Sequence, residues 1–413
     1  MSRADDSLRV ALLSYRSKPH CGGQGVYLRL LSRELTDLGH EVEVFSGQPY
    51  PDLDRDEIKL TKVPSLDLYN DDDPFRTPRI REFRDWIDVL EFAHMKTGGF
   101  PEPLTFSLRA LRELRKRHRD FDVVHDNQVL GYGNLGIPRL GVPFVTSIHH
   151  PISVDRRIEI EAARGIKEHF GKRRWYGFVR MQAQVASRVG RILTVSESSK
   201  IDIVKDFHAK PEDIHILPLG VDTEIFHPRE APRVKGRIVA MASADSPLKG
   251  VDVLLRAVAK VATERDVHVV IVSKPQKDGP TERLVRELAL GERVKFVSGI
   301  SDAELGDLLA SAEIAAVPSR YEGFSLPAVE HMASGSPLVA SRAGALPEVV
   351  GDAAVLVEPG DVEELAATLR RLHDSPDERA RIAEAGYQRV QERYTWRAVA
   401  IATVEHYRAA IKG

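Results

Sequence analysis

Residues 313–330, EIAAVPSRYEGFSLPAVE, hold the pattern that decides the fold. The run Glu313–Pro318 is apolar and of strand length, and Pro327 suits the first turn of a helix that follows it. Two glutamates, Glu322 and Glu330, stand eight positions apart in the connection and the helix. A strand that leads through a short turn into a helix is one unit of a parallel α/β sheet.

Ten further apolar runs of strand length lie on both sides of this segment, and many are rich in Val and Ile. Runs that are apolar on both faces are typical of parallel strands covered by helices on each side. The ten runs are Leu8–Leu13, Glu41–Phe45, Phe121–His125, Pro143–His149, Arg191–Val195, Arg237–Ala242, Val267–Ser273, Arg293–Val297, Pro337–Ser341 and Ala353–Val357. Their alternation with helical segments predicts doubly wound α/β layers.

Two of the helical segments carry signals for their ends. Leucines in the segment 27–38 fall on one face, and Gly39 is placed to end that helix. The segment 362–372 repeats apolar residues at three and four positions. Asp361 is placed as its N-cap, with Glu364 in position to complete a capping box.

The strand and helix pattern occurs twice, which predicts two domains. Residues 1–218 form the first domain and residues 236–393 the second, joined by the polar segment 219–235 as a linker. Residues 394–413 are helical in pattern and belong to either domain, with a crossing back to the first as one alternative. Residues from about 64 to 103 break the alternation, and we interpret them as an insertion.

The composition favours a globular protein of the cytoplasm. The 413 residues include 59 Lys and Arg against 61 Asp and Glu, and 59 − 61 = −2 argues against a dedicated nucleic-acid binder. The single cysteine excludes an internal disulfide framework. The first residues lack the apolar core of a signal peptide, and no run approaches the roughly 18 apolar residues of a spanning helix.

A glycine-rich turn follows the first predicted strand, at Gly22, Gly23 and Gly25. Backbone N–H groups at the start of the next helix could hold an anion there, and a plain tight turn is the equal alternative. The turn differs from a dinucleotide fingerprint, because no glycine lies three residues beyond Gly25 and the second strand ends without an acidic residue. Cys21 has no identifiable base, so an unreactive thiol is the favoured interpretation.

Ligands of doubly wound sheets bind at the carboxyl ends of the strands. His149 and His150 end one strand, where a histidine could bond a polar ligand or simply pack. Adjacent residues of an extended chain point to opposite sides, which argues against a shared metal ion. Lys249 stands at a loop-to-helix junction, where a lysine suits a phosphate, although a solvated lysine is commoner.

Three charged stretches each allow more than one interpretation. Asp71–Asp73 resembles a carboxylate cluster, but it lies in the insertion and is favoured as a solvated loop, so we assign no metal. Residues 164–191 hold eight basic residues, and residues 109–119 hold six. These two stretches could dock an anionic membrane surface or a phosphorylated acceptor, or they could be solvated helix faces.

The segment 320–330 resembles the donor-site signature of the retaining glycosyltransferases of family 4, which have the GT-B fold. Three more segments are similar to this family: the segment 218–226 to its interdomain segment, Lys249–Asp252 to its phosphate-binding lysine motif, and Gly22-Gly23 to its first glycine loop. The further matches to the signature are Gly335, Pro337, Gly344 and Pro347–Val350. The resemblance implies two Rossmann-like domains that face each other across a cleft.

The resemblance also implies roles for single residues. Glu330 would bind the nucleotide ribose, Glu322 would contact the transferred sugar, and His149 would meet that sugar near its hydroxymethyl group. Lys249 and Gly23 would approach the diphosphate. The remaining donor-binding residues that it implies are Gly323, Phe324, Ser325 and Leu326, with Val297 and Ser298 near the base.

This sequence departs from the family pattern at two places. Ala244 stands where the family usually has an arginine, and Lys274-Pro275-Gln276-Lys277 replaces a frequent glycine-rich turn. Lys274 is therefore a candidate substitute cation for the diphosphate.

The activity implied is transfer of a sugar from a nucleotide-diphosphate sugar with retention, by front-face attack, without a metal or another cofactor. The acceptor would be lipid-linked or a small molecule. The basic stretches of the first domain could make peripheral contact with the inner face of a membrane. The rival hypotheses are a sugar-nucleotide epimerase on the same fold and a non-catalytic nucleotide-sugar binding protein. The second rival draws support from Ala244. A nicotinamide oxidoreductase is disfavoured because the dinucleotide fingerprint is missing.

Overall fold

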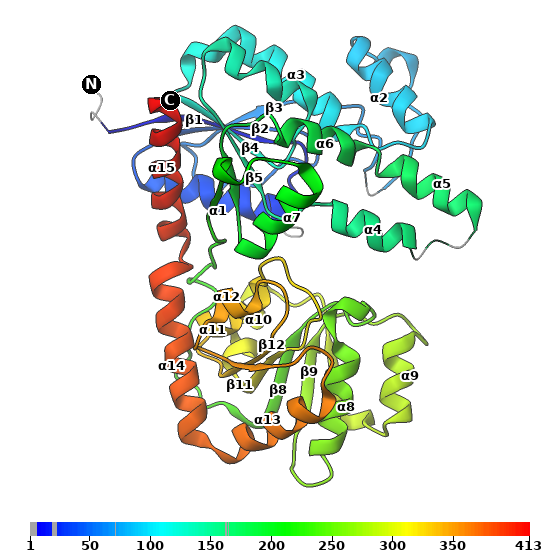
Figure 1. Cartoon of the computed structure of the whole chain (residues 1–413), viewed down its shortest axis with the longest axis vertical. Coiled ribbons are helices and arrows are strands. Elements are labelled where there is room, and N and C mark those ends of the chain that lie inside the picture. Colours follow the sequence, from blue (N-terminus) through cyan, green and yellow to red (C-terminus); the bar gives the residue numbers. More distant parts are fainter. Residues whose placement is uncertain (1–5, 19–22, 71, 162, 164) are drawn as a thin grey trace. The chain divides into compact units, whose positions relative to one another are not determined.

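The computed structural model describes residues 6–18, 23–70, 72–161, 163 and 165–413, and these form two compact units (Figure 1). The first unit comprises the described parts of Met1–Val195 together with Ser199–Leu217 and Val399–Gly413. The second unit comprises Ser196–Ser198 and Pro218–Ala398. Cys21, Gly22 and Asp71, which the sequence analysis singled out, lie outside the described residues.

The first unit is built on a seven-stranded parallel sheet in the order β3-β2-β1-β4-β5-β6-β7. Its strands are β1 Arg9–Ser14, β2 Glu41–Ser46, β3 Lys59–Lys62, β4 Val123–Asn127, β5 Phe144–Ile148, β6 Ile192–Thr194 and β7 Ile214–Ile216. The five strands predicted for this unit are confirmed. The two edge strands were missed because β7 has three residues and β3, KLTK, carries a lysine at each end.

Strand residues that include Leu13, Phe45 and Ile148 form a buried apolar core with helical residues such as Leu114 and Val185. The α-helices are α1 Gly23–Asp37, α2 Trp86–Lys96, α3 Glu102–Arg117, α4 Ser153–Glu161, α5 Ile166–Trp175, α6 Phe178–Ala186, α7 Glu197–Phe207 and α15 Trp396–Lys412. Gly39 ends the turn after α1 with φ of +90°, a conformation that other residues rarely adopt. The predicted glycine cap is therefore confirmed.

The insertion is folded against α3. Arg109 of α3 forms buried ion pairs with Asp88, at 2.6 Å, and with Glu91, and both acids lie on α2. A small apolar cluster, including Leu68 and Tyr69, packs beside this ionic group. A buried charge is stable only when it is paired, so these contacts fix the orientation of α2.

The second unit is built on a six-stranded parallel sheet in the order β10-β9-β8-β11-β12-β13. Its strands are β8 Val234–Met241, β9 His268–Val272, β10 Val294–Val297, β11 Ala312–Val317, β12 Leu338–Ser341 and β13 Val355–Val357, and all six were predicted. Its α-helices are α8 Val251–Val261, α9 Pro280–Glu287, α10 Asp302–Ala310, α11 Leu326–Ala333, α12 Leu346–Val350, α13 Val362–Asp374 and α14 Pro376–Arg393.

The structure confirms one of the two predictions made for the start of α13. The Asp361 carboxylate accepts hydrogen bonds from the N–H groups of Glu363 and Glu364, at 2.9 Å each, which confirms it as the N-cap. The Glu364 carboxylate instead accepts from the N–H of Glu358 at 2.7 Å, so the prediction of a closed capping box is wrong. The Glu358 N–H, in the loop before the helix, donates to Glu364 where a capping box would have the Asp361 N–H.

The segment before β8 packs within the second unit. The Val221 N–H donates to the Tyr394 carbonyl at 2.7 Å, and Phe226 is buried. In α15 the residues from Val399 on belong to the first unit. No helix in the described part of the chain is both long and apolar enough to cross a membrane.

Because all strands within each sheet run parallel, their carboxyl ends meet at one edge. His149 follows β5 in the first sheet. Lys249 follows β8 and Glu322 follows β11, which are neighbouring strands of the second sheet. The candidate residues therefore lie at the edges where doubly wound sheets bind ligands.

Candidate active site

The loops after β8 and β11 bring Lys249 and Glu322 into direct contact. The Lys249 Nζ donates to Glu322 Oε1 at 2.8 Å, and the Ser319 hydroxyl donates to the same oxygen at 2.7 Å. The Glu322 side chain is nearly buried, at 9% exposed, whereas that of Lys249 is 33% exposed. The pair joins the two residues that the sequence analysis assigned to the sugar and to the diphosphate.

Two glycines allow these loops to pack backbone against backbone. Gly250 has φ of +63°, and a Cβ there would lie 2.0 Å from the Pro318 carbonyl oxygen. Gly344 has φ of +53°, and a Cβ there would lie 2.2 Å from the Glu322 carbonyl oxygen. That same oxygen accepts a hydrogen bond from the Ala345 N–H at 2.9 Å. Only glycine fits either position, so the loop around Glu322 is held on two sides.

The left-handed residue of the donor loop is Ser325, with φ of 85°, and not Gly323. A serine in this conformation costs about 1–3 kcal/mol, so the surrounding structure must hold it there. The Ser325 hydroxyl is buried and has no hydrogen-bond partner among the described residues. The backbone N–H groups of Phe324, Ser325 and Leu326 also have no hydrogen-bond acceptor among the described residues. Unpaired donors at a helix start can bind an anion.

Phe324 contributes to the loop in a different way. Its side chain is buried, and its ring packs edge-to-face on Tyr394 with centroids 5.8 Å apart. The Tyr394 hydroxyl donates in turn to the Val349 carbonyl at 3.0 Å. Phe324 therefore anchors the loop in the core, and it can offer a ligand only its backbone.

Glu330 lies on α11, and its Oε2 atom is buried without a hydrogen-bond partner among the described residues. Burial raises the pKa of this carboxyl to about 7, with a smaller contribution from the Asp302 carboxylate. An unpaired buried carboxylate costs about 1–3 kcal/mol or more, and it gains most from a ligand that donates hydrogen bonds. A pair of ribose hydroxyls has the required donors.

Ala244 carries no charge, and its backbone is held by two neighbouring segments of the second unit. The Ala244 N–H donates to the Ser273 hydroxyl at 3.0 Å, and its carbonyl accepts from Thr281 at 2.8 Å. Arg320 is committed elsewhere, because its guanidinium binds both oxygens of Asp252 at 2.9 and 2.8 Å. Lys249 is therefore the cation that the structure places beside Glu322.

Three predicted donor residues lie at the same sheet edge without touching the Lys249–Glu322 pair. Lys274 follows β9 and is exposed. Val297 ends β10, where its carbonyl accepts from the Ser273 N–H at 2.8 Å, and Ser298 is exposed beside it. No hydrogen bond or ion pair within the described residues joins any of the three to Lys249 or Glu322, so their roles stay predictions.

In the first unit, His149 is held by neighbours on two sides. Its Nε2 lies 2.7 Å from Asn127 Oδ1, and its ring packs on Tyr27 with centroids 4.4 Å apart. Burial lowers the pKa of His149 to about 4, so the ring is neutral near pH 7. His150 offers its backbone carbonyl to the Gln128 amide at 2.7 Å. Gly23, the remaining predicted residue of this unit, opens α1.

Sequence reasoning missed Asn127, Tyr27 and Ser319 as members of these sites. Asn127 lies two residues beyond the end of the apolar run Phe121–His125, and Ser319 directly follows Glu313–Pro318. Polar residues at the carboxyl ends of predicted strands were the available signal for both. Tyr27 carried no such signal, because it lies on the buried face of a helix.

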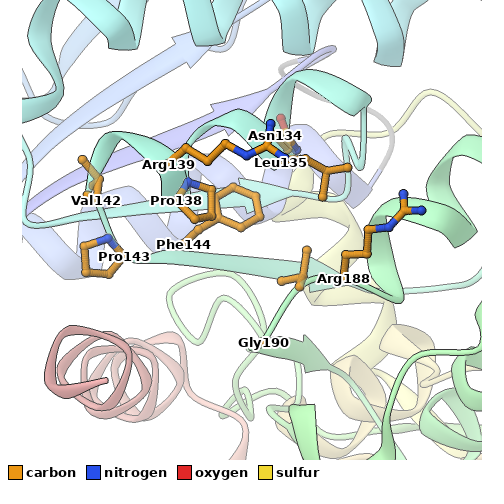
Figure 2. Close-up of a pocket in the computed structure, with 11 residues that line it drawn as sticks. Asn134, Leu135, Pro138, Arg139, Val142, Pro143, Phe144, Arg188 and Gly190 are labelled. Atoms are coloured by element: carbon orange, nitrogen blue, oxygen red, sulfur yellow. The ribbon is translucent and has the colours of Figure 1, made fainter.

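Figure 2 shows a pocket of the first unit that is separate from His149. Its volume is about 580 Å³, and Arg139 and Arg188 reach along its walls. Pro143 and Gly190, which line it, precede β5 and β6. The pocket therefore lies at the amino ends of strands whose carboxyl ends carry the candidate site, and it takes no part in that site.

Two models of protein families match the chain, one in each half. Glycosyltransferase Family 4 matches residues 21–225, and Glycosyl transferases group 1 matches residues 222–389. The chain is also 58% identical over 407 residues to the MMP alpha-(1->4)-mannosyltransferase of Mycolicibacterium hassiacum, with 98% of each chain covered. This chain belongs to the family 4 glycosyltransferases. It is a glycosyltransferase that uses a nucleotide-sugar donor, and its fold is GT-B.

More distant relatives agree with this assignment. The D-inositol 3-phosphate glycosyltransferase of Thermobispora bispora is 28% identical over 435 residues, with 98% of this chain and 95% of the relative covered. The structure of a sucrose-phosphate synthase from Thermosynechococcus elongatus matches with a TM-score of 0.70 at 21% identity, covering 98% of this chain and 99% of the other. At 21% identity, the similarity to the sucrose-phosphate synthase supports only the assignment of the fold.

The described residues contain no group of three or more His, Cys, Asp or Glu side chains that could hold a metal ion. The groups that can neutralise a diphosphate there are Lys249 and the N–H donors at the start of α11. Lys249 contacts Glu322 directly, and the start of α11 follows Glu322 in the same loop.

Proposed function

We propose that this glycosyltransferase transfers mannose from a nucleotide-diphosphate mannose to an MMP acceptor, a methylmannose polysaccharide, and forms an α-(1→4) linkage. The observation that carries the proposal is the identity of 58% with an MMP alpha-(1->4)-mannosyltransferase over 98% of both chains. An α linkage in the product keeps the configuration of an α-linked donor, so the reaction proceeds with retention.

Departure of the diphosphate is the difficult step, because negative charge grows on the leaving oxygen while the sugar becomes cation-like. In our proposal Lys249 and the N–H groups of Phe324–Leu326 stabilise that charge. Glu330 binds the ribose and fixes the nucleotide. Glu322 accepts hydrogen bonds from sugar hydroxyls and stabilises the positive charge that develops on the ring.

The proposed attack takes place on the face from which the diphosphate leaves. The bond between the anomeric carbon and the diphosphate oxygen breaks, and a bond from the acceptor hydroxyl oxygen to that carbon forms. The acceptor proton passes to the departing diphosphate. This route needs no protein nucleophile, and the hydrogen bonds that Glu322 Oε1 already accepts favour a binding role for that carboxylate.

The experiment is a transfer assay with mannose diphosphates of guanosine, uridine and adenosine, and with α-(1→4)-linked methylmannose oligomers as acceptors. We expect elongation by one mannose, with an α-(1→4) linkage in the nuclear magnetic resonance spectrum. Glucose from the matching nucleotide serves as the control donor. Transfer of another sugar in preference to mannose, or a β product, would contradict the proposal. Conversion of the donor to an epimer without any acceptor would favour the epimerase alternative.

Glu322→Ala provides a second test, because the proposal gives Glu322 a contact with the sugar only. Turnover should fall strongly, whereas affinity for the bare nucleoside diphosphate should stay within about threefold, since no ribose or phosphate contact is lost. A large loss of nucleoside diphosphate affinity would indicate that Glu322 contacts the nucleotide and not the sugar.

A further inference from the structure

We propose that Asn127 is a positioning residue that holds His149 as the tautomer with its proton on Nε2, so that Nδ1 is presented as a hydrogen-bond acceptor. The inference rests on the proposed role of His149 in sugar transfer, but the tautomer itself can be measured without any sugar.

The orientation of the Asn127 amide is set by a neighbour that can only accept. The amide nitrogen Nδ2 lies 3.1 Å from the backbone carbonyl oxygen of Gln24, in the first turn of α1. A carbonyl oxygen accepts hydrogen bonds and donates none, so the nitrogen side of the amide must face Gln24. The opposite amide atom, Oδ1, then faces His149 at 2.7 Å.

The tautomer of His149 follows from this orientation. Asn127 Oδ1 can only accept, so His149 Nε2 must donate and carry the proton. A neutral imidazole has one protonated nitrogen, which leaves Nδ1 as an acceptor. Burial lowers the pKa of His149 and keeps the ring neutral near pH 7. No described residue donates a hydrogen bond to Nδ1.

The plane of the His149 ring is fixed by a second set of contacts. Tyr27 packs on the ring, and its hydroxyl lies 3.1 Å from the Ser147 hydroxyl of β5. Ser147 also bonds His125 Nε2 at 2.7 Å, and His125 Nδ1 bonds the Tyr407 hydroxyl at 2.7 Å. A buried chain of hydrogen bonds thus supports the Tyr27 ring, which supports His149.

These contacts determine the class of group that His149 can receive. A neutral nitrogen acceptor suits a hydroxyl donor, such as a sugar hydroxyl, and repels the acceptor oxygens of a phosphate. An aspartate at position 127 would also accept from Nε2, but its charge would favour the protonated imidazolium, which has no acceptor. Asparagine supplies the hydrogen bond without that charge, which explains why an amide serves here.

The test uses the full-length protein labelled with ¹⁵N histidine, with His149→Gln to assign the signal. Long-range ¹H–¹⁵N spectra distinguish the two tautomers by the nitrogen shifts. We expect the Nε2–H tautomer for His149 at pH 7. In Asn127→Ala the spectrum should show both tautomers, and in Asn127→Asp the protonation midpoint of His149 should move up by one pH unit or more.

Activity supplies the second readout. Asn127→Ala should lower kcat about tenfold and leave the donor KM within about twofold, and Asn127→Asp should move the acid limb of the pH profile upward. Asn70→Ala, in the insertion, is the matched control and should change neither spectrum nor profile. An Nδ1–H tautomer in the parent protein would overturn the proposal even if transfer proceeds as proposed. Unchanged His149 signals in both Asn127 variants would overturn it as well.

Discussion

The polar groups at the two sheet edges are satisfied to different degrees. In the first unit, His149 bonds Asn127, and the buried His125 bonds a hydroxyl with each ring nitrogen. In the second unit, Ser325 and Glu330 each have a buried oxygen without a partner among the described residues. An unpaired buried polar atom costs about 1–3 kcal/mol. Asp126 Oδ1, at the end of β4, is the comparable unpaired oxygen of the first edge. We infer that the residues around His149 are positioned by the protein alone, whereas Ser325 and Glu330 gain their missing bonds from the donor nucleotide.

The Lys249–Glu322 ion pair is the exception in the second unit. Its nitrogen and oxygen lie 2.8 Å apart, and Lys249 is the more exposed partner. A lysine on a flexible stem can turn from a carboxylate to a diphosphate, whereas the buried glutamate keeps its bond to Ser319. The comparison therefore predicts one mobile cation, Lys249, near the unpaired Ser325 hydroxyl and the unpaired Glu330 carboxylate oxygen.

The largest expected effect is that of Lys249→Ala on turnover. Charge on the leaving diphosphate grows in the transition state, so loss of the cation should lower kcat about a hundredfold, which corresponds to about 2.7 kcal/mol. Lys274→Ala should also slow transfer if Lys274 replaces the family arginine missing at Ala244, and the double variant should then depart from additivity. Near-normal kcat in the single Lys249 variant and in the double variant would show that the diphosphate is bound elsewhere.

The next effect concerns acid stability of the first unit. Burial lowers the pKa of His125 to about 3, below the roughly 6.5 of an unfolded chain. The unfolded state therefore binds the proton more readily, and stability should fall as the pH drops below about 6.5. Between pH 7 and pH 5 this group alone should cost about 2 kcal/mol, from about 1.4 kcal/mol per pKa unit.

Urea unfolding at several pH values checks this prediction. His125→Gln should be less stable than the parent at pH 7, because hydrogen bonds are lost, but its stability should fall less steeply toward pH 5. The exposed His208, changed to Gln, is the matched control and should keep the steep slope of the parent. Equal slopes in the parent and in His125→Gln would mean that the buried cluster does not remain neutral.

The smallest expected effect is on the basic surface of the first unit. Arg173 and Arg180 are exposed and line one pocket, whereas Arg174 binds the Thr97 carbonyl at 3.1 Å and supports the insertion. Arg173→Glu with Arg180→Glu therefore tests membrane docking without breaking that contact. Each charge contributes about 1 kcal/mol near an anionic surface, so vesicle sedimentation should weaken severalfold and fall with added salt. No binding of the parent to anionic vesicles at low salt would support solvated helix faces.

Much of the fold could be predicted from apolar periodicity, because buried parallel strands need apolar residues on both faces. The short edge strands were not predicted, since β7 has only three residues and β3, KLTK, has an exposed lysine at each end. The carboxyl ends of strands also indicated Lys249, Glu322 and His149. The pairing of Lys249 with Glu322 could not be predicted, because it depends on how loops from neighbouring strands pack. The positioning role of Asn127 could not be predicted for the same reason, because it depends on the hydrogen bond to the Gln24 carbonyl of α1.

The most direct measurement of the central claim is calorimetric binding of the nucleoside diphosphate of the active donor at pH 6 and pH 8. Burial raises the pKa of free Glu330 to about 7, and ribose hydroxyls that donate to it favour the ionised form. Binding should therefore release a proton, and affinity should be about tenfold higher at pH 8 than at pH 6.

Glu330→Ala separates this effect from titration of the ligand. The variant should bind about 1.5–3 kcal/mol more weakly at pH 8 and should lose the pH dependence that belongs to the protein, whereas Glu322→Ala should keep both. A Glu330→Ala protein that binds with the affinity and pH dependence of the parent would contradict the assignment of the nucleotide to α11.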